Sequence, residues 1–311
     1  MRIAKTVTSL ALSASALLYC NSALAEPHIL TSIKPLELLV RAVATDDMHI
    51  STLVPAGSSP HNYSMTPSKR RALENADIIF WVGPEMETFL SRLLTGSEFG
   101  ERSITLMGSG SDAGHVEATD LPRDHEGESH AHGPGGGEDP HIWVDPQMAL
   151  TMAEAIRDAL AQLEGANKLA LDNNLETFRA SIAAKEQQIR TQLKPLQNAS
   201  LFAYHSAFTR FAGHYNLNVE GVLTLNPELS PGARHIAGVQ NSLRSADHPC
   251  LLTEPQFNRQ WWHSITEGLD VTFSTWDPLA TDIDATANGY TAFQQSIADA
   301  VLKCLPENTE H

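Results

Sequence analysis

Residues 171–195 read LDNNLETFRASIAAKEQQIRTQLKP, and this stretch sets the organisation of the whole chain. Polar residues fill one face of it, and apolar side chains recur at helical spacing on the other, at Leu171, Leu175, Phe178, Ile182, Ile189 and Leu193. The helix should end before Pro195, since proline cannot continue a helix. A narrow apolar stripe with a polar back is typical of a helix that runs along a larger body. We therefore predict one long helix that joins two halves of the chain.

A second helical pattern lies just before this helix. Asp145 followed by Pro146 matches the N-cap and the first residue of a helix. Apolar residues then recur at helical spacing, at Ala149, Met152, Ala153, Ile156, Leu160 and Leu163. Gly165 is expected to separate the two helices. We assign residues 148–195 to a helical segment that includes the linker helix.

Short apolar runs alternate with helical patterns on both sides of this segment. The expected strands are Ile29–Ile33, Ile50–Val54, Ile78–Val82, Ile104–Met107, Leu201–Tyr204, Val219–Leu223, Leu251–Glu254 and Val271–Trp276. The expected helices between and after them are Leu36–Val43, Ser68–Asn75, Glu85–Leu94, Ala207–Tyr215, Pro231–Leu243, Gln260–Gly268 and Tyr290–Leu302, with Ser68 as the cap of its helix. Such alternation is typical of α/β proteins. We predict two open, mostly parallel-sheet lobes, at residues 26–147 and 196–311, joined by one long rigid helix.

The first 25 residues have the pattern of a secretory signal peptide. A short positive region is followed by an apolar stretch at Val7–Tyr19 and by Ala23-Leu24-Ala25, the small-x-small pattern that signal peptidase cleaves. The apolar stretch is too short to span a bilayer. Tyr19 is bulky where a lipidation signal before Cys20 would need a small residue. We expect cleavage after Ala25 and export of the remainder.

Charge and cysteine usage limit the partners of the exported chain. Loss of the two basic residues of the signal changes the formal charge from −16 to −18, which disfavours nucleic acid and anionic lipid and favours a cation. Cys250 and Cys304 remain as an even pair in an oxidising compartment, which predicts a disulfide. A metal bound by these cysteines is the alternative, but neither has a Cys or His partner at the usual ligand spacing.

Residues 115–138 form a polar tract rich in histidine, in which residues 124–133 read DHEGESHAHG. With almost nothing apolar to bury, the tract cannot form a core, and we expect a loop. Its imidazoles and carboxylates suit a divalent transition metal. We predict a secondary, weak metal site there, with His235 as an ambiguous further member, at His115, His125, His130, His132 and His235.

A second set of candidate ligands follows the ends of expected strands or precedes a helix. His61 ends the loop VPAGSSPH, His141 lies in DPHIWVDP, His205 follows an apolar strand, and Asp277 follows another. In open α/β sheets, ligands bind beyond the carboxyl ends of the strands, so a cleft between the halves would collect these four side chains. Three neutral imidazoles with one oxygen suit tetrahedral Zn²⁺, whereas Mn²⁺ favours more oxygen ligands. Because ligand imidazoles must be deprotonated, capture is expected to weaken as the pH falls through about 6.5.

At these residues the sequence resembles the periplasmic metal-binding proteins of ABC transporters, in the zinc-uptake (ZnuA-like) group. The motifs that carry the resemblance are Ser59-Pro-His61-Asn-Tyr63, Ala76–Gly83, Asp139–Pro146, Tyr204–Phe208, Asn226–Gly232, Glu254–Phe257 and Asp277–Leu279. They keep the order of the family and cover nearly the whole exported chain. The resemblance implies two α/β lobes joined by one long helix, with the metal between the lobes.

The resemblance also implies ligands, partners and location. The histidines of three motifs carry over as zinc ligands to His61, His141 and His205, whereas a carboxylate near Asp277 is a ligand in the manganese-type relatives. The pair Cys250 and Cys304 resembles a disulfide of zinc-type members. The implied protein is a periplasmic monomer that delivers Zn²⁺ to an inner-membrane ABC permease with its cytoplasmic ATPase, with periplasmic zinc chaperones as a further class of partner.

Three other functions compete with a zinc receptor. The first is a receptor of the Mn²⁺ type. The second is a secreted zinc hydrolase, because three histidines with an open position are also a catalytic arrangement, although the sequence has no His-Glu-x-x-His motif and no obvious general base beside a ligand. The third is a metal-dependent adhesin or buffering protein. A cleaved signal without a lipidation motif fits a diffusible receptor better, and we expect no enzymatic activity.

Overall fold

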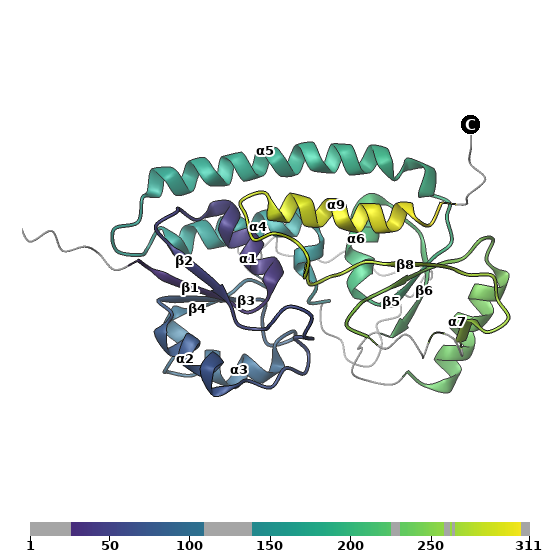
Figure 1. Ribbon diagram of the computed structural model, residues 1–311, viewed down its shortest axis with the longest axis horizontal. Helices are drawn as coiled ribbons and strands as arrows, with labels where there is room; N and C mark the ends of the chain where they lie inside the picture. The colour runs from purple at the N-terminus through teal and green to yellow at the C-terminus, as the bar shows by residue number, and fades with distance from the viewer. Residues whose placement is uncertain (1–25, 109–138, 225–230, 258–261, 263–264, 306–311) are drawn as a thin grey trace, which may run out of the picture.

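A computed structural model describes residues 26–108, 139–224, 231–257, 262 and 265–305 (Figure 1). The predicted signal peptide and the histidine-rich tract lie outside these residues. Two sheets lie at opposite ends of the molecule, and helix α5 (Lys168–Gln192) runs along both of them (Figure 1). With 25 residues, α5 is about 37 Å long and is the predicted joining helix. In the described part of the chain, no helix is both long and apolar enough to cross a membrane.

The N-terminal sheet has the strand order β2-β1-β3-β4, and every pair in it is parallel. Its strands are β1 (His28–Thr31), β2 (His49–Thr52), β3 (Ile78–Trp81) and β4 (Ser103–Thr105). Its helices are α1 (Lys34–Val43), α2 (Pro67–Asn75) and α3 (Thr88–Leu94). All four residues of β3 are buried, as its unbroken apolar sequence predicts for a parallel strand covered on both faces.

The C-terminal sheet has the equivalent strand order, β6-β5-β7-β8, and is also parallel throughout. Its strands are β5 (Leu201–His205), β6 (Val219–Thr224), β7 (Cys250–Thr253) and β8 (Thr272–Thr275). Its helices are α6 (Ala207–Tyr215), α7 (Ala233–Ser245) and α9 (Gly289–Leu302). Of the helix expected at Gln260–Gly268, residues 262, 265 and 266 are helical, and residues 260, 261, 263 and 264 lie outside the described residues. The predicted α/β class with two parallel-sheet lobes is confirmed.

Two helix starts in the N-terminal lobe differ from the prediction. Thr66, not Ser68, caps α2: its hydroxyl accepts from the backbone N of Lys69 at 3.5 Å, and Pro67 takes the first helical position. Helix α3 begins at Thr88 rather than at Glu85. The carboxyl group of Glu87 turns inward and accepts from the backbone N of Val82 and Gly83, which closes a turn where the helix was expected.

The first helix of the connecting segment starts as predicted from its cap. Asp145 caps α4 (Pro146–Leu160), because its Oδ1 accepts from the backbone N of Gln147 at 2.7 Å and of Met148 at 3.2 Å. Gly165 separates α4 from α5 with a φ of 77°, a left-handed conformation that favours glycine. Asn167 caps α5, because its Oδ1 accepts from the backbone N of Ala170 at 3.1 Å, so each helix has its own cap.

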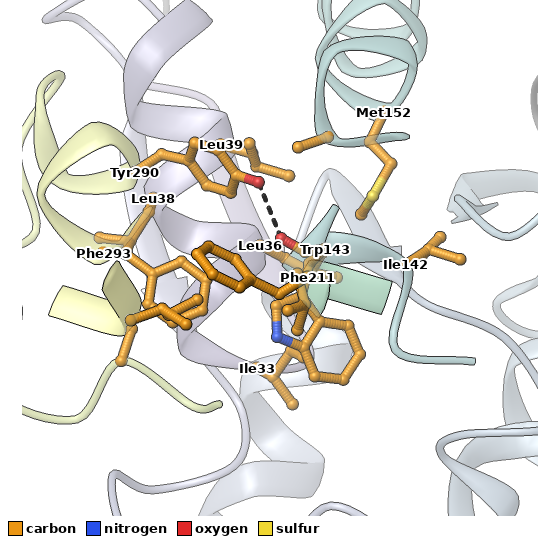
Figure 2. Packing of buried hydrophobic residues seen from close by; sticks show 14 of the residues in the cluster. Ile33, Leu36, Leu38, Leu39, Ile142, Trp143, Met152, Phe211, Tyr290 and Phe293 are labelled. Atoms are coloured by element: carbon orange, nitrogen blue, oxygen red, sulfur yellow. Dashed lines mark hydrogen bonds between the residues drawn. The ribbon is translucent and has the colours of Figure 1, made fainter. Parts of the chain in front are cut away.

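One large hydrophobic cluster runs through both lobes, and each lobe has a smaller cluster of its own on the other face of its sheet. Trp143 lies in the 3₁₀ turn Ile142–Val144, and its ring is packed among side chains of α1 and α9 (Figure 2). The backbone O of Trp143 accepts from the Tyr290 hydroxyl at 2.8 Å, and the backbone O of Val144 accepts from Gln294 Nε2 at 3.0 Å. Helix α9 also packs along α5 (Figure 1). The C-terminal helix thus ties the C-terminal sheet to the N-terminal lobe.

Two further features hold α9 in place. At Gly289, a Cβ atom would lie 2.7 Å from Leu38 Cδ2 on α1 and 2.6 Å from the backbone O of Asp284, so only glycine allows this approach. At the other end of the helix, the predicted disulfide between Cys250 and Cys304 is confirmed and links β7 to the residues that follow α9. The start of α9 is therefore fixed against the N-terminal lobe and its end against the C-terminal sheet.

Candidate metal centre

Three imidazoles from separate parts of the chain meet between the lobes. His205 is the last residue of β5, at the carboxyl end of the C-terminal sheet. His141 directly precedes the turn that carries Trp143 into the shared core. His61 lies in the loop that follows β2 in the N-terminal lobe. The arrangement agrees with the general placement of ligand sites beyond the carboxyl ends of parallel strands.

The spacing of the three rings is close to that of a common coordination shell. One ring nitrogen from each lies within 4.8 Å of the other two. The ring centroids are 4.5 Å apart for His141 and His205, 5.5 Å for His61 and His141, and 5.9 Å for His61 and His205. A tetrahedral Zn²⁺ with bonds of 2.0–2.1 Å places its nitrogen ligands about 3.4 Å apart. Small movements of His61 would complete such a shell.

Carboxylates orient two of the three rings. Asp139 Oδ1 lies 2.6 Å from Nδ1 of His141, and Glu254 Oε1 lies 2.8 Å from Nδ1 of His205. An ionised carboxylate only accepts hydrogen bonds, so in both rings Nδ1 carries the proton and Nε2 presents a lone pair. The two Nε2 atoms lie 3.0 Å apart. Two lone pairs that face each other at this distance repel, and a cation bound between them removes the repulsion.

Burial keeps two of the imidazoles in the neutral form that a metal needs. It lowers the pKa of His61 to about 3, an effect that the neighbouring His141 and His205 reinforce. Burial also lowers the pKa of His141 to about 4, although the hydrogen bond to Asp139 acts in the opposite direction. The expectation that capture weakens as the pH falls through about 6.5 remains a prediction, and the lowered pKa values of these two side chains move their own protonation to lower pH. They remain deprotonated well below that pH.

The carboxylate partners are themselves held in place. Glu254 is 2% exposed, and burial raises its pKa, an effect that His205 opposes. Burial also acts to raise the pKa of Asp139, but the hydrogen bonds and charge of His141 together with the charge of Arg210 outweigh it, and the net pKa is lowered. Arg210 of α6 approaches Asp139 Oδ2 at 3.6 Å. Helix α6 of the C-terminal lobe thereby supports Asp139, the carboxylate that orients the His141 ring.

The remaining predicted ligands do not join this cluster. Asp277 lies next to residues of the cavity wall, but its carboxylate oxygens accept from Gln256 and from the backbone N of Leu279 and Thr281. His235 is exposed on α7, with its Nε2 2.8 Å from the backbone O of Val222. The other members of the predicted weak site, His115, His125, His130 and His132, lie outside the described residues.

Three side chains that shape the site were missed by the sequence reasoning. Asp139 and Glu254 orient the rings, and Gln256 lines the same cavity as the imidazoles. Each belongs to a motif that was noted, Asp139-Pro-His141 or Glu254-Pro-Gln-Phe257, but the motif alone gave them no role. The available signal was position: Glu254 directly follows β7, next to the strand that ends in His205.

Comparisons with known proteins agree with this fold and site. The sequence profile of the family described as "Zinc-uptake complex component A periplasmic" matches residues 29–304. The "High-affinity zinc uptake system protein ZnuA" of Yersinia pestis is 35% identical and covers 95% of this chain and 96% of its own length. The protein of the same name from Haemophilus ducreyi is 30% identical, with coverages of 91% and 94%.

Solved structures share the fold at lower identity. A crystal structure of ZnuA superposes with a TM-score of 0.69 at 23% identity, over 88% of this chain and 99% of that one. The periplasmic zinc binding protein TroA from Treponema pallidum gives 0.70 at 18% identity, over 89% and 99%. The sequence matches extend over nearly the whole described chain. This protein belongs to the periplasmic zinc-uptake component A (ZnuA) family.

Proposed function

We propose that this protein is a periplasmic receptor that captures Zn²⁺ between its lobes and delivers it to the permease of an ABC transporter. The observation that carries the proposal is the meeting of three imidazoles, two of which present Nε2 lone pairs 3.0 Å apart. Membership of a family of zinc-uptake components supports the same function, and this family consists of solute-binding receptors rather than enzymes.

In this proposal, the protein binds the metal and makes or breaks no covalent bond in it. His61, His141 and His205 supply neutral nitrogen ligands, and the carboxylates behind two of them keep Nε2 turned to the metal. The lowered pKa values of His61 and His141 mean that little proton release accompanies binding. The shared core resists large movements of the lobes, so capture would need only local adjustment around the cavity.

The proposal extends to location and partners. Cleavage after Ala25 would release the chain as a diffusible periplasmic protein, and we propose that it acts as a monomer. The receiving permease spans the inner membrane and is driven by a cytoplasmic ATPase, and periplasmic zinc chaperones are a further class of partner. The zinc-uptake names of the family and of the relatives support a transport role.

We also propose that the imidazoles of residues 115–138 bind zinc more weakly than the central site and raise its local concentration. The composition of the tract supports this role, with four histidines among acidic residues and glycines. A variant without residues 115–138 should keep one tight equivalent of zinc and lose the weaker ones. Unchanged stoichiometry together with unchanged delivery to the permease would contradict this part of the proposal.

Metal analysis of the native protein tests the main function. Protein purified from its own periplasm should contain zinc, and the metal-free protein should bind Zn²⁺ more tightly than Mn²⁺ in competition with a chelator. Alanine variants of His61, His141 and His205 should each lower the zinc content. Native zinc content in all three variants, or a clear preference for Mn²⁺, would contradict the proposal. Hydrolase assays on the zinc-loaded protein should show no turnover.

A further inference from the structure

Asp277 is an acidic side chain near the cavity whose carboxylate is held by hydrogen bonds away from the imidazoles. Its Oδ1 accepts from Gln256 Nε2 at 2.6 Å and from the backbone N of Leu279 at 2.9 Å, and its Oδ2 accepts from the backbone N of Thr281 at 2.7 Å. Two of these three donors belong to the turn that Asp277 itself begins. The only side-chain donor among them is Gln256.

Gln256 contacts both this carboxylate and the cavity of the imidazoles. Its side chain lines the same cavity as His61, His141 and His205. The orientation of its amide follows from chemistry: Asp277 only accepts hydrogen bonds, so the NH₂ end must face it, and the carbonyl end faces away. That carbonyl oxygen, Oε1, is buried and has no hydrogen-bond partner among the described residues. A buried amide oxygen without a partner at a cavity wall is costly unless a bound species uses it.

The turn that begins at Asp277 is also attached to the core of the site. The indole Nε1 of Trp143 donates to the backbone O of Pro278 at 2.8 Å, and the Trp143 ring lies 5.3 Å from the ring of His141. The turn that carries this carboxylate is therefore held at a fixed place in the cavity wall. Without the hydrogen bond from Gln256, Oδ1 of Asp277 would lose one of its two donors. The hydrogen bonds from the backbone of Leu279 and Thr281 would still keep the turn in place.

We propose that Gln256 is a positioning residue that determines which metal the site selects. Its Nε2–H keeps Asp277 out of the coordination shell, so the metal meets three neutral nitrogen donors and no carboxylate. Its Oε1 accepts a hydrogen bond from the water that completes a tetrahedral shell. Such a shell suits Zn²⁺, whereas Mn²⁺ requires more oxygen ligands. This inference rests on the proposed zinc-receptor function and adds the origin of its selectivity.

The test compares Zn²⁺ and Mn²⁺ affinities of the exported chain and three variants. Gln256→Leu keeps the volume but cannot donate to Asp277, and the double variant Gln256→Leu/Asp277→Asn also removes the freed carboxylate. Gln240→Leu is the matched control, because Gln240 donates to the backbone O of Ile265 and does not line the cavity. In Gln256→Leu, the ratio of the Mn²⁺ Kd to the Zn²⁺ Kd should fall about tenfold, the scale of changes beside metal ligands. The control should keep the wild-type ratio, and the double variant should recover most of it, because the freed carboxylate is gone.

The outcomes separate this inference from the proposed function. An unchanged ratio in a folded Gln256→Leu variant, or a gain in Mn²⁺ affinity that persists in the double variant, would overturn the role of Gln256. Wild-type protein that binds no zinc would instead overturn the receptor function. If Gln256→Leu does not fold, a crystal structure of the zinc-loaded wild type decides the matter. Asp277 should still contact Gln256 there, and an Asp277 oxygen at about 2.0–2.2 Å from the zinc would overturn the proposal.

Discussion

The two lobes share one strand order but present their histidines in different ways. His205 ends a central strand, is 2% exposed, and has Glu254 on its Nδ1. His61 lies in a loop and is half-buried, and its ring forms no hydrogen bond with another described residue. The backbone N of His61 donates to the Ser59 hydroxyl at 3.3 Å. The same topology therefore gives one imidazole that a carboxylate orients and one in a loop without such a partner among the described residues.

The largest effect should come from removing a preorganised ligand. Zinc sites with four protein ligands bind with roughly 10–16 kcal/mol, about 3–4 kcal/mol per ligand. Alanine at His205 or His141 should therefore weaken zinc binding about 100- to 1000-fold. Alanine at His61 should cost less, because water can reach its half-buried position. Competition with a chelator measures the zinc affinity of all three alanine variants. A larger loss of affinity for His61→Ala than for His205→Ala would contradict the expected order.

Removing the charge of Glu254, which accepts a hydrogen bond from His205, should lower zinc affinity by a smaller factor. Glu254→Gln keeps an acceptor but removes the charge that raises the basicity of the imidazole, and zinc affinity should fall about 10-fold. Glu87→Gln is the matched control in the other lobe. Glu87 is also buried, and burial raises its pKa to about 7, but it binds Ser32 and backbone N–H groups rather than a histidine. If both variants lost the same amount of zinc affinity, the effect of Glu254→Gln would be a general structural one and would not come from its contact with His205.

The pH dependence of binding distinguishes a buried site from exposed imidazoles. The pKa of His61 is lowered to about 3 and that of His141 to about 4, so neither ring carries a proton at pH 6. Calorimetry at pH 6 in buffers of different ionisation enthalpy should show the release of one proton or fewer per zinc. Release of two or more would mean that these rings are protonated in the metal-free protein.

The same pKa shifts affect the stability of the metal-free protein. In the unfolded chain these histidines take up protons below about pH 6.5, whereas in the folded protein they stay neutral down to about pH 4. The unfolded state thus binds more protons in this window, and the free energy of unfolding should decrease as the pH falls from 6.5 to 4. Denaturant titrations of wild type and of His61→Ala and His141→Ala measure this slope, which should be shallower in the variants. Equal slopes in the wild type and the variants would contradict the lowered pKa values of His61 and His141.

The smallest effect on zinc should come from the disulfide. Cys250→Ser with Cys304→Ser removes the link between β7 and the end of α9, far from the imidazoles along both elements. Unfolding should become easier by about 2–4 kcal/mol. Zinc affinity should stay within about twofold of wild type, because the hydrogen bonds of Trp143 still tie the lobes together. A large loss of affinity would mean that α9 controls the site.

Local patterns were enough to predict most of the fold and the three histidines. The stripe from Leu171 to Ile189 is buried along α5, and the apolar run of β3 is buried throughout. The cap of α2 and the start of α3 were missed because Thr66 and Ser68 are equally good caps in sequence, and because Glu87 turns inward only in the folded lobe. Helical periodicity carries no information on such choices.

The groups that tune the site could not be predicted for a related reason. Gln256 and Asp277 are 21 residues apart, and only the neighbouring positions of β7 and β8 bring them within 2.6 Å. Asp277 was predicted as a ligand from its place after a strand, and that role remains a prediction that the observed hydrogen bonds do not favour. Sequence position places a side chain at the edge of a sheet, but hydrogen bonds across strands determine where its charge is used.

Anomalous diffraction at the zinc edge, from crystals of the exported chain loaded with one equivalent of Zn²⁺, would locate the metal itself. We expect one strong peak between the lobes, about 2.0–2.1 Å from a ring nitrogen of each of His61, His141 and His205. A peak elsewhere, or a peak that lacks any one of these three rings as a ligand, would contradict the assignment of the metal centre.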